Sequence, residues 1–273
     1  MRIFMLDQSP LGKQTTYITT YSPELLFPIP RTMARNKIGL TSLPFTGLDI
    51  WNSYELSWLD QKGKPQIAFA EFHFPYDNPN IVESKSFKLY LNSFNQTKIG
   101  SLAELNEILE RDLSQVSLGP VTVELYSSAD FKKQPMREFS GTCLDFLDIE
   151  TNAYHVSPEF LSTSSDYVEE SIYSELLKSN CLATGQPDWG TIYIRYAGHK
   201  IAHEGLLKYI ISYRKHSGFH EDCVEKIFYD ISTYCKPEKL TVYARYVRRG
   251  GLDINPFRSN FETDPVNLRL NRQ

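Results

Sequence analysis

The chain has 273 residues, of which 41% are hydrophobic and 13% aromatic, enough apolar surface for one large or two ordinary domains. Its formal net charge is −4, from 29 basic and 33 acidic residues, which argues against a surface built to bind nucleic-acid phosphates. The apolar start of the sequence is too short for a signal peptide, and no run reaches the roughly 18 residues that cross a bilayer. We therefore expect a soluble, cytoplasmic protein with no membrane partner and no direct contact with nucleic acid.

The first half of the chain begins with residues 1–45, which we expect to form an irregular arm. Alternating apolar residues predict strands at 55–59 and 66–74. The sequence Gln-Lys-Gly-Lys at 61–64 between them is typical of a hairpin turn.

A helix is predicted next, from about Leu102 to Leu113. Ser101 and Glu104 have the spacing of a capping box, in which the serine accepts a bond from a first-turn amide and the glutamate reaches back. A strand at 122–126 follows, and a polar stretch from Ser127 to Glu138 is the expected linker.

The second half repeats the pattern of the first. Residues 81–91 match 201–211 at an offset of 120 positions, and the strand at 122–126 matches 241–245 at an offset of 119. Apolar positions kept in phase over such a distance indicate two similar units in tandem. We therefore predict an α+β protein with domains at 1–45 (arm), 46–130 (first unit) and 131–273 (second unit).

The second unit should contain a strand at 191–196 and a helix that begins near Phe219. The buried stripe of this helix is predicted from apolar residues at helical spacing, which are Val224, Ile227, Phe228 and Ile231. His220 and Glu221 then lie at its amino end, where free amides and the helix dipole favour a polar ligand. Simple helix capping is the alternative interpretation.

Four cysteines are widely spaced, with no pair at the spacing of a zinc ribbon or redox dithiol; they are Cys143, Cys181, Cys223 and Cys235. Cys181 lies seven residues before Asp188 in a turn-rich segment. A thiol with a nearby carboxyl group can perform covalent catalysis, although a single cysteine is more often an inert apolar side chain. Cys223 and Cys235 are expected to be core residues.

Several separated strings together resemble one family, the NADPH-dependent 7-cyano-7-deazaguanine reductases of queuosine biosynthesis. The strings are Glu83–Tyr90, Ser179–Cys181 with Pro187–Gly190, Phe219–Glu221 and Arg248–Pro256. The resemblance covers nearly the whole chain and fits the long form of the family. It implies two tandem tunnelling-fold units, each an antiparallel sheet with two helices on one face, and association into a homodimer.

The resemblance implies reduction of an aromatic nitrile to an aminomethyl group with two NADPH and no metal. Cys181 would attack the nitrile of 7-cyano-7-deazaguanine to form a thioimide, Asp188 would carry the proton, and His220 would assist proton delivery. Phe219 would help to close the pocket. A carboxylate that pairs with the N–H edge of the base would be Glu221 or, as second choice, Glu83.

The family also assigns base contacts to Val82, Glu83 and Ser84, and NADPH contacts to Ser84, Lys85, Arg249 and Gly250. Cations suit the 2′-phosphate of NADPH, and glycine permits a close backbone approach. The chain carries no glycine-rich dinucleotide motif after a strand. The nicotinamide cofactor is therefore implied by the resemblance alone.

Three other functions compete with this interpretation. His216, His220 and Cys223 are spaced as a zinc-binding helix face would require, and related cyclohydrolases use zinc. A cysteine hydrolase would form the same thioimide and let water attack it. A non-catalytic module would have the same fold and would bind purine-like or pterin-like ligands without catalysing a reaction.

Overall fold

The computed structural model describes residues 17–273 apart from 41, 128–129, 131–134 and 183. The chain forms two compact units. Unit 1 comprises the described residues of Met1–Thr41, Asp49–Pro135 and Arg248–Asp253, and unit 2 comprises those of Ser42–Leu48, Met136–Val247 and Ile254–Gln273. The expected domains 1–45, 46–130 and 131–273 stay a prediction, and part of the expected linker lies outside the described residues. Among those residues, no helix is both long and apolar enough to span a bilayer.

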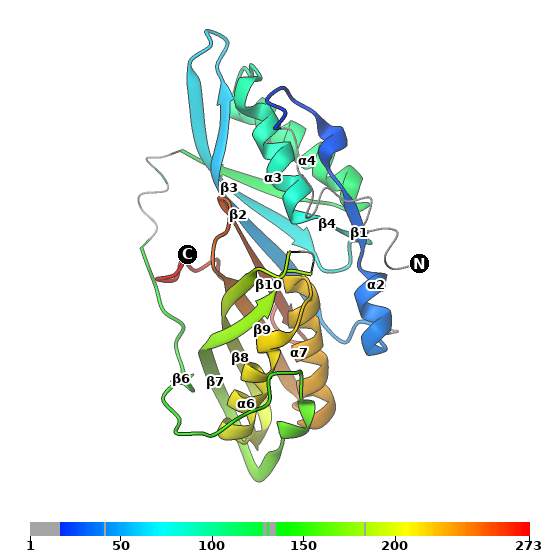
Figure 1. Ribbon diagram of the computed structural model, residues 1–273, viewed down its shortest axis with the longest axis vertical. Helices are drawn as coiled ribbons and strands as arrows, with labels where there is room; N and C mark the ends of the chain where they lie inside the picture. The colour runs from blue at the N-terminus through cyan, green and yellow to red at the C-terminus, as the bar shows by residue number, and fades with distance from the viewer. Residues whose placement is uncertain (1–16, 41, 128–129, 131–134, 183) are drawn as a thin grey trace. The chain divides into compact units, whose positions relative to one another are not determined.

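Unit 1 is an α+β unit in which α3 and α4 lie on the same face of its strands (Figure 1). Its elements are η1 (Pro23–Leu25), β1 (Pro28–Pro30), α2 (Thr32–Arg35), η2 (Asn36–Ile38), β2 (Thr46–Leu59), β3 (Pro65–Pro75), β4 (Asn80–Val82), α3 (Ser84–Ser93), η3 (Phe94–Gln96), α4 (Leu102–Ser117) and β5 (Thr122–Tyr126). The strand order is β5-β3-β2, with β1 and β4 paired separately. The pairs β3–β5 and β1–β4 are antiparallel. Residues 46–48 of β2 are counted in unit 2.

The local predictions for unit 1 are largely confirmed. The β2–β3 hairpin turns at the predicted place, where Gly63 has a φ of 84° that suits glycine. Ser101 accepts from the amide of Glu104 at 3.1 Å, as predicted for the capping box. The Glu104 carboxylate reaches back to the amide of Gly100, one residue before the expected one, at 2.7 Å. The helix continues to Ser117, beyond the predicted end.

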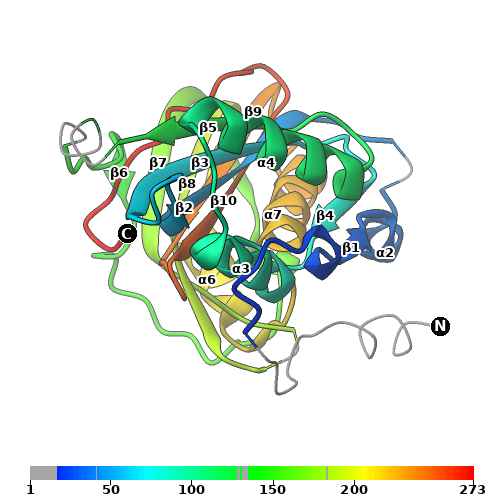
Figure 2. The ribbon, with the colours of Figure 1, turned by 90° about the horizontal axis from the view of Figure 1, so that it is seen from above.

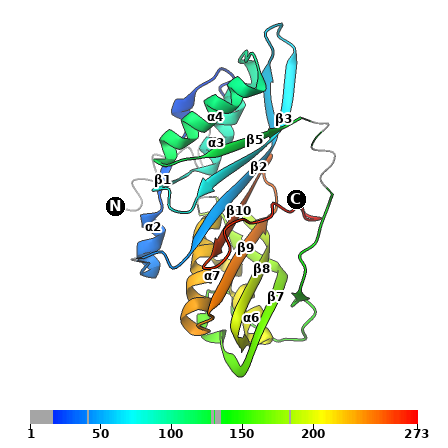
Figure 3. The ribbon, with the colours of Figure 1, turned by 180° about the vertical axis from the view of Figure 1, so that it is seen from behind.

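Unit 2 has the same construction, and Figure 3 shows its strands β7, β8 and β9 on one side of α6 and α7. Its elements are β6 (Thr142–Cys143), η4 (Pro158–Phe160), β7 (Thr163–Asn180), β8 (Pro187–Ile201), α6 (His203–Ser212), η5 (Tyr213–Lys215), α7 (His220–Tyr234), β9 (Lys239–Tyr246) and β10 (Leu252–Ser259). Leu252 and Asp253 of β10 are counted in unit 1. The order is β10-β9-β8-β7-β6. The pairs β7–β8, β8–β9 and β9–β10 are antiparallel, whereas the two-residue β6 runs parallel to β7. The sheet is therefore mixed, and not purely antiparallel as expected.

The helix predicted near Phe219 is α7, which begins at His220 with Phe219 as its N-cap residue. Its apolar stripe packs inside unit 2 as predicted, because the four expected residues are at most 1% exposed. They are Val224, Ile227, Phe228 and Ile231. The helix therefore has a fixed face, which determines where its amino-terminal side chains lie.

The sequence repeat corresponds to repeated contacts between the two helices of each unit. Tyr90 of α3 donates to Asp112 of α4 at 2.7 Å, and Tyr209 of α6 donates to Asp230 of α7 at the same distance. All four side chains are buried. Since a buried hydroxyl and a buried carboxylate each need a partner, this pair joins the two helices in both units. Figure 2 shows α3 and α4 of unit 1 from above.

A second repeated feature precedes each unit's helices. The sequence Ser-Pro-Glu starts the short helix η1 at Ser22 and η4 at Ser157. In unit 1 the amide of Ser22 donates to the hydroxyl of Ser93 at 3.2 Å, and in unit 2 the amide of Ser157 donates to that of Ser212, also at 3.2 Å. Each turn thus contacts the end of a helix in its own unit, α3 in unit 1 and α6 in unit 2.

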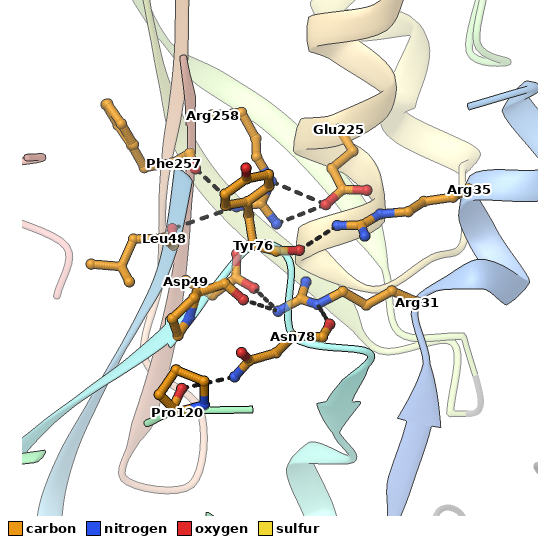
Figure 4. A network of polar contacts seen from close by, with 11 residues as sticks. Arg31, Arg35, Leu48, Asp49, Tyr76, Asn78, Pro120, Glu225, Phe257 and Arg258 are labelled. Atoms are coloured by element: carbon orange, nitrogen blue, oxygen red, sulfur yellow. Dashed lines mark hydrogen bonds and ion pairs between the residues drawn. The ribbon is translucent and has the colours of Figure 1, made fainter. Parts of the chain in front are cut away.

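Each unit also contains a buried ion pair, and Figure 4 shows both with their backbone partners. In unit 1, Arg31 binds Asp49 at 2.6 Å. In unit 2, Arg258 of β10 binds Glu225 of α7 at 2.8 Å, with 0% and 3% of the two side chains exposed. The Arg258–Glu225 pair ties α7 to the sheet, one turn after His220.

Candidate active site

Cys181 immediately follows the last residue of β7, in the turn that leads to β8. Its amide donates to the carbonyl of Gln186 at 2.8 Å, and its carbonyl accepts from the amide of Gly185 at 3.0 Å. Gly185 has a φ of 67°, which favours glycine. Cys181 is 8% exposed, so a tightly hydrogen-bonded turn holds a largely covered thiol.

The register of the strands places several candidate residues on one face of unit 2. Ser179 of β7 is opposite Asp188 of β8, and Gly190 of β8 is opposite Tyr246 of β9. Side chains directly opposite each other share a face, and so do residues two apart on one strand. Asp188 therefore lies on the same face as Tyr246, and Cys181 follows two residues after Ser179, just beyond the end of β7.

His220, the first residue of α7, is brought to this row. Its Nε2 lies 3.6 Å from Oδ2 of Asp188, and the two side chains are 15% and 7% exposed. Its ring stacks on Tyr246 with ring centroids 3.8 Å apart and an angle of 22° between the planes. The distance to Asp188 is longer than a hydrogen bond. Two of the three predicted catalytic residues are thus in direct contact.

The residue before Cys181, Asn180, connects β7 to the loop that leads into α7. Its amide and its side-chain Nδ2 both donate to the carbonyl of His216, at 2.8 and 3.1 Å, and its carbonyl accepts from the amide of Gly218 at 3.3 Å. The Lys178 ammonium donates to the Asn180 side chain and, at 2.9 Å, to the carbonyl of Arg214. The hydrogen bonds of Asn180 therefore hold the loop before α7 next to the end of β7, directly before Cys181.

Glu221 and Phe219 flank His220 at the start of α7. Glu221 is 3% exposed and lies in the first helical turn, where the helix dipole stabilises a carboxylate. Phe219 is the N-cap residue, and its carbonyl accepts from the amide of Cys223 at 3.1 Å. Both therefore have a backbone position set by the helix start.

The thiol of Cys223 lies beneath this cluster and is fully buried. Burial, with a smaller contribution from the charge of Asp222, raises the pKa of Cys223 to about 12. Burial raises the pKa of Cys235 to about 11. Both thiols stay protonated at neutral pH, which agrees with the expected role of core residues.

The zinc site considered from the sequence needs His216, His220 and Cys223 on one helix face. His216 instead lies in the loop before α7, next to η5. No group of three or more potential metal ligands occurs in the described part of the chain. His216 therefore does not lie on one helix face with His220 and Cys223, as the zinc interpretation requires.

The predicted substrate and cofactor residues of the first half lie in unit 1. Glu83 is the N-cap of α3, and its two carboxylate oxygens accept from the amides of Lys85 and Ser86 at 2.7 and 2.8 Å. It is completely buried, and desolvation raises its pKa, opposed mainly by those two amides. Val82 precedes it at the end of β4, and Ser84 begins the helix. Glu83 therefore has a structural role whatever else it binds.

The glycine turn at 250–251 lies against α3 of the same unit. Gly250 has a φ of 60°, and a Cβ there would lie 3.4 Å from the side chain of Lys88. The guanidinium of Arg248 stacks on Tyr54 with 4.4 Å between its central carbon and the ring centroid, and the Tyr54 amide donates to Gly251 at 2.9 Å. Arg248, Arg249 and Lys88 bring positive charge to this turn, which suits a phosphate-bearing cofactor, whereas the carboxylate of Glu55 lies against Gly251.

The structure thus brings His220 into contact with Asp188 in unit 2, with Phe219 and Glu221 next to His220 at the start of α7 and Cys181 just after the last residue of β7. Asn180, Gly190 and Tyr246 were not expected to contribute. Gly190 and Asn180 lie within the strings that resemble the family. Gly190 contacts β9 and Asn180 contacts the loop before α7, and a short string cannot predict contacts between segments that are distant in sequence. Tyr246 directly follows the predicted strand at 241–245 and is the last residue of β9, so its position alone could have been inferred.

Known proteins match the chain over almost its full length. Residues 17–125 match the family model described as "Nitrile reductase, 7-cyano-7-deazaguanine-reductase N-term", and residues 187–265 match "QueF-like protein". The NADPH-dependent 7-cyano-7-deazaguanine reductase of Cupriavidus necator is 59% identical over 98% of this chain and 99% of its own length. That of Burkholderia multivorans is 56% identical with the same coverage.

One solved structure, "Crystal structure of the archaeosine synthase QueF-Like in the apo form", is 16% identical, with a TM-score of 0.31, and covers 37% of this chain and 99% of its own. The identity to the two full-length relatives is what assigns the family. The chain belongs to the NADPH-dependent 7-cyano-7-deazaguanine reductases.

Proposed function

We propose that this chain reduces the nitrile of 7-cyano-7-deazaguanine to 7-aminomethyl-7-deazaguanine with two NADPH, as a step in queuosine biosynthesis. The observation that carries the proposal is 59% identity over 98% of the chain to a reductase of that name. The cluster of Asp188 and His220 beside the Cys181 turn supports it, because it contains the groups that such a reaction needs.

Cys181 is the proposed nucleophile. The thiol passes its proton to Asp188 as its sulfur bonds to the nitrile carbon. The carbon–nitrogen triple bond becomes a double bond, and the nitrogen takes that proton from Asp188. The product is a thioimide attached to Cys181. Covalent attachment divides a difficult reduction into easier steps and holds the carbon in place.

His220 is proposed to deliver protons to the nitrogen while the carbon is reduced. NADPH, when bound, would supply a hydride ion in each of two rounds, which together provide the four electrons that convert a nitrile to an amine. Between the two rounds the carbon–sulfur bond breaks and Cys181 leaves as a thiolate, so that the amine is released free of the protein. The contact between His220 and Asp188 lets the two side chains exchange a proton after a small movement. The low exposure of both side chains limits access of water to reactive intermediates.

Substrate and cofactor binding are assigned to both units. Glu221 is the proposed acceptor for the N–H edge of the base, with Val82, Glu83 and Ser84 as further base contacts. Since both oxygens of Glu83 already bind helix amides, each can accept only one more bond. Glu221 therefore remains the first choice.

The proposed NADPH contacts are Ser84, Lys85, Arg249 and Gly250. The left-handed conformation of Gly250 and its contact with Lys88 fit a turn that admits a phosphate group close to the backbone. The proposal includes two tunnelling-fold units, a homodimer formed through sheet edges, and a cytoplasmic location, where NADPH is supplied.

The decisive experiment follows the absorbance of NADPH in the presence of 7-cyano-7-deazaguanine. We expect two NADPH to be oxidised for each nitrile consumed and none without the nitrile. Cys181→Ala should abolish both turnover and the covalent adduct seen by intact mass spectrometry. A hydrolase would consume the nitrile without NADPH, and a binding module would bind it without consuming it. Either result would overturn the proposal.

A further inference from the structure

Tyr246 is a buried aromatic residue to which the proposed chemistry gives no role. It ends β9, is 1% exposed, and stacks face to face with the ring of His220. Burial raises the pKa of its hydroxyl well above the usual range, with a further contribution from the nearby Cys223. The hydroxyl therefore stays protonated and cannot act as a base, so the ring is the part of the side chain that can affect His220.

The stacking geometry restricts the imidazole of His220. Ring centroids 3.8 Å apart with planes 22° from parallel leave little freedom to rotate about the last side-chain bond. In this orientation Nε2 points toward Asp188, at 3.6 Å. A rotation of the imidazole would remove the contact, and proton transfer depends steeply on such distances.

Gly190 provides the space that the Tyr246 ring occupies. The two residues are directly opposite each other on β8 and β9. A Cβ at Gly190 would lie 3.2 and 3.3 Å from Cδ1 and Cε1 of Tyr246, closer than ordinary carbon contacts of 3.5–4.0 Å. A side chain at position 190 would therefore require the Tyr246 ring to shift by a few tenths of an ångström.

The hydroxyl of Tyr246 contributes little to this arrangement. It lies near Ser179 and Cys223, yet neither the Tyr246 nor the Ser179 hydroxyl has a hydrogen bond of good geometry within the part of the chain that the structure describes. Removing a buried hydroxyl without a good partner has a small effect. Phenylalanine should thus replace tyrosine here with little loss.

We propose that Tyr246 is a positioning residue that holds the imidazole of His220 toward Asp188, and that Gly190 is required to admit its ring. The inference rests on the proposed function, because it assigns a support for the proton donor of that reaction. It predicts that the stack affects the reduction steps and not the attack by Cys181, since only the reduction depends on His220.

The test compares Tyr246→Leu with Tyr246→Phe and Gly190→Ala. For Tyr246→Leu we expect kcat for NADPH oxidation to fall by about 10–100-fold, as for a misplaced catalytic group. The rate of adduct formation with 7-cyano-7-deazaguanine alone, followed by intact mass, should stay within about threefold of the original protein. Tyr246→Phe should retain kcat within about twofold. Gly190→Ala should also lower kcat. If Tyr246→Leu does not fold, Gly190→Ala provides the test of the proposal in its place.

A double-mutant cycle with His220→Ala separates positioning from a general packing defect. If the ring acts through His220, Tyr246→Leu should cause no further loss of kcat once the imidazole is absent. Equal losses with and without His220, or slowed adduct formation in Tyr246→Leu, would overturn the inference. If the unaltered protein neither forms the adduct nor oxidises NADPH, the proposed function fails instead, which is a distinguishable result.

Discussion

Breaking the buried Arg258–Glu225 pair should strongly destabilise unit 2. Both guanidinium nitrogens Nε and Nη2 donate to Oε1 of Glu225, at 3.0 and 2.8 Å. The remaining Nη1 donates to the backbone carbonyl of Phe257 at 2.8 Å. In Glu225→Gln the arginine charge stays buried and loses the carboxylate that neutralises it. The loss in free energy of unfolding should be about 3–5 kcal/mol.

Urea denaturation followed by circular dichroism measures this loss, and an exposed pair serves as the control. Arg195 binds Glu169 at 2.9 Å, a length between those of the two buried contacts, but 38% and 52% of the side chains are exposed. Glu169→Gln should therefore cost no more than about 1 kcal/mol. Replacing both Arg258 and Glu225 by Met should restore much of the stability, because no buried charge remains. A loss below about 1 kcal/mol in Glu225→Gln would refute the reasoning.

Three further outcomes are expected. Asn180→Ala, which removes the side-chain bond to the loop before α7, should lower kcat about tenfold or more while adduct formation persists, as kinetics and intact mass would reveal. The folded protein at pH 8 should resist iodoacetamide at Cys223, whose pKa is about 12, and react at the part-exposed Cys143, as peptide mapping would detect. Tyr209→Phe, which deprives the buried Asp230 of a donor, should lower the free energy of unfolding by about 1–3 kcal/mol in urea titration.

Alkaline pH should weaken the fold in a defined range. The pKa of Cys223 is raised from an ordinary value near 9 to about 12 in the folded protein. A group whose folded pKa is raised contributes stability that is complete below the unfolded pKa and is lost as the pH rises through the folded one. The melting temperature should thus fall progressively above pH 9, and Cys223→Ala should reduce that fall. Equal pH dependence in the variant would contradict this explanation.

The local elements were predictable because their causes are local. A serine and a glutamate three residues apart place the start of α4, and a periodic stripe of apolar residues places α7. The repeat of the two halves also follows from apolar periodicity, and it extends to the Tyr90–Asp112 and Tyr209–Asp230 pairs. The strand β7, 18 residues long, was not predicted at all. Its first half is polar and exposed and lacks the alternation that marks a half-buried strand.

The arrangement around His220 could not be predicted for a different reason. A histidine at a helix start can turn toward solvent, toward a cap or toward a partner, and the sequence of α7 does not choose among them. The choice is made by Tyr246, which arrives from β9, by the missing side chain of Gly190 on β8, and by Asn180, which fixes the loop before the helix. Each of these contacts joins segments that are distant in sequence. The residue types of the site could therefore be predicted from motifs. Their geometry could not, because it depends on how three strands and one loop pack around these residues.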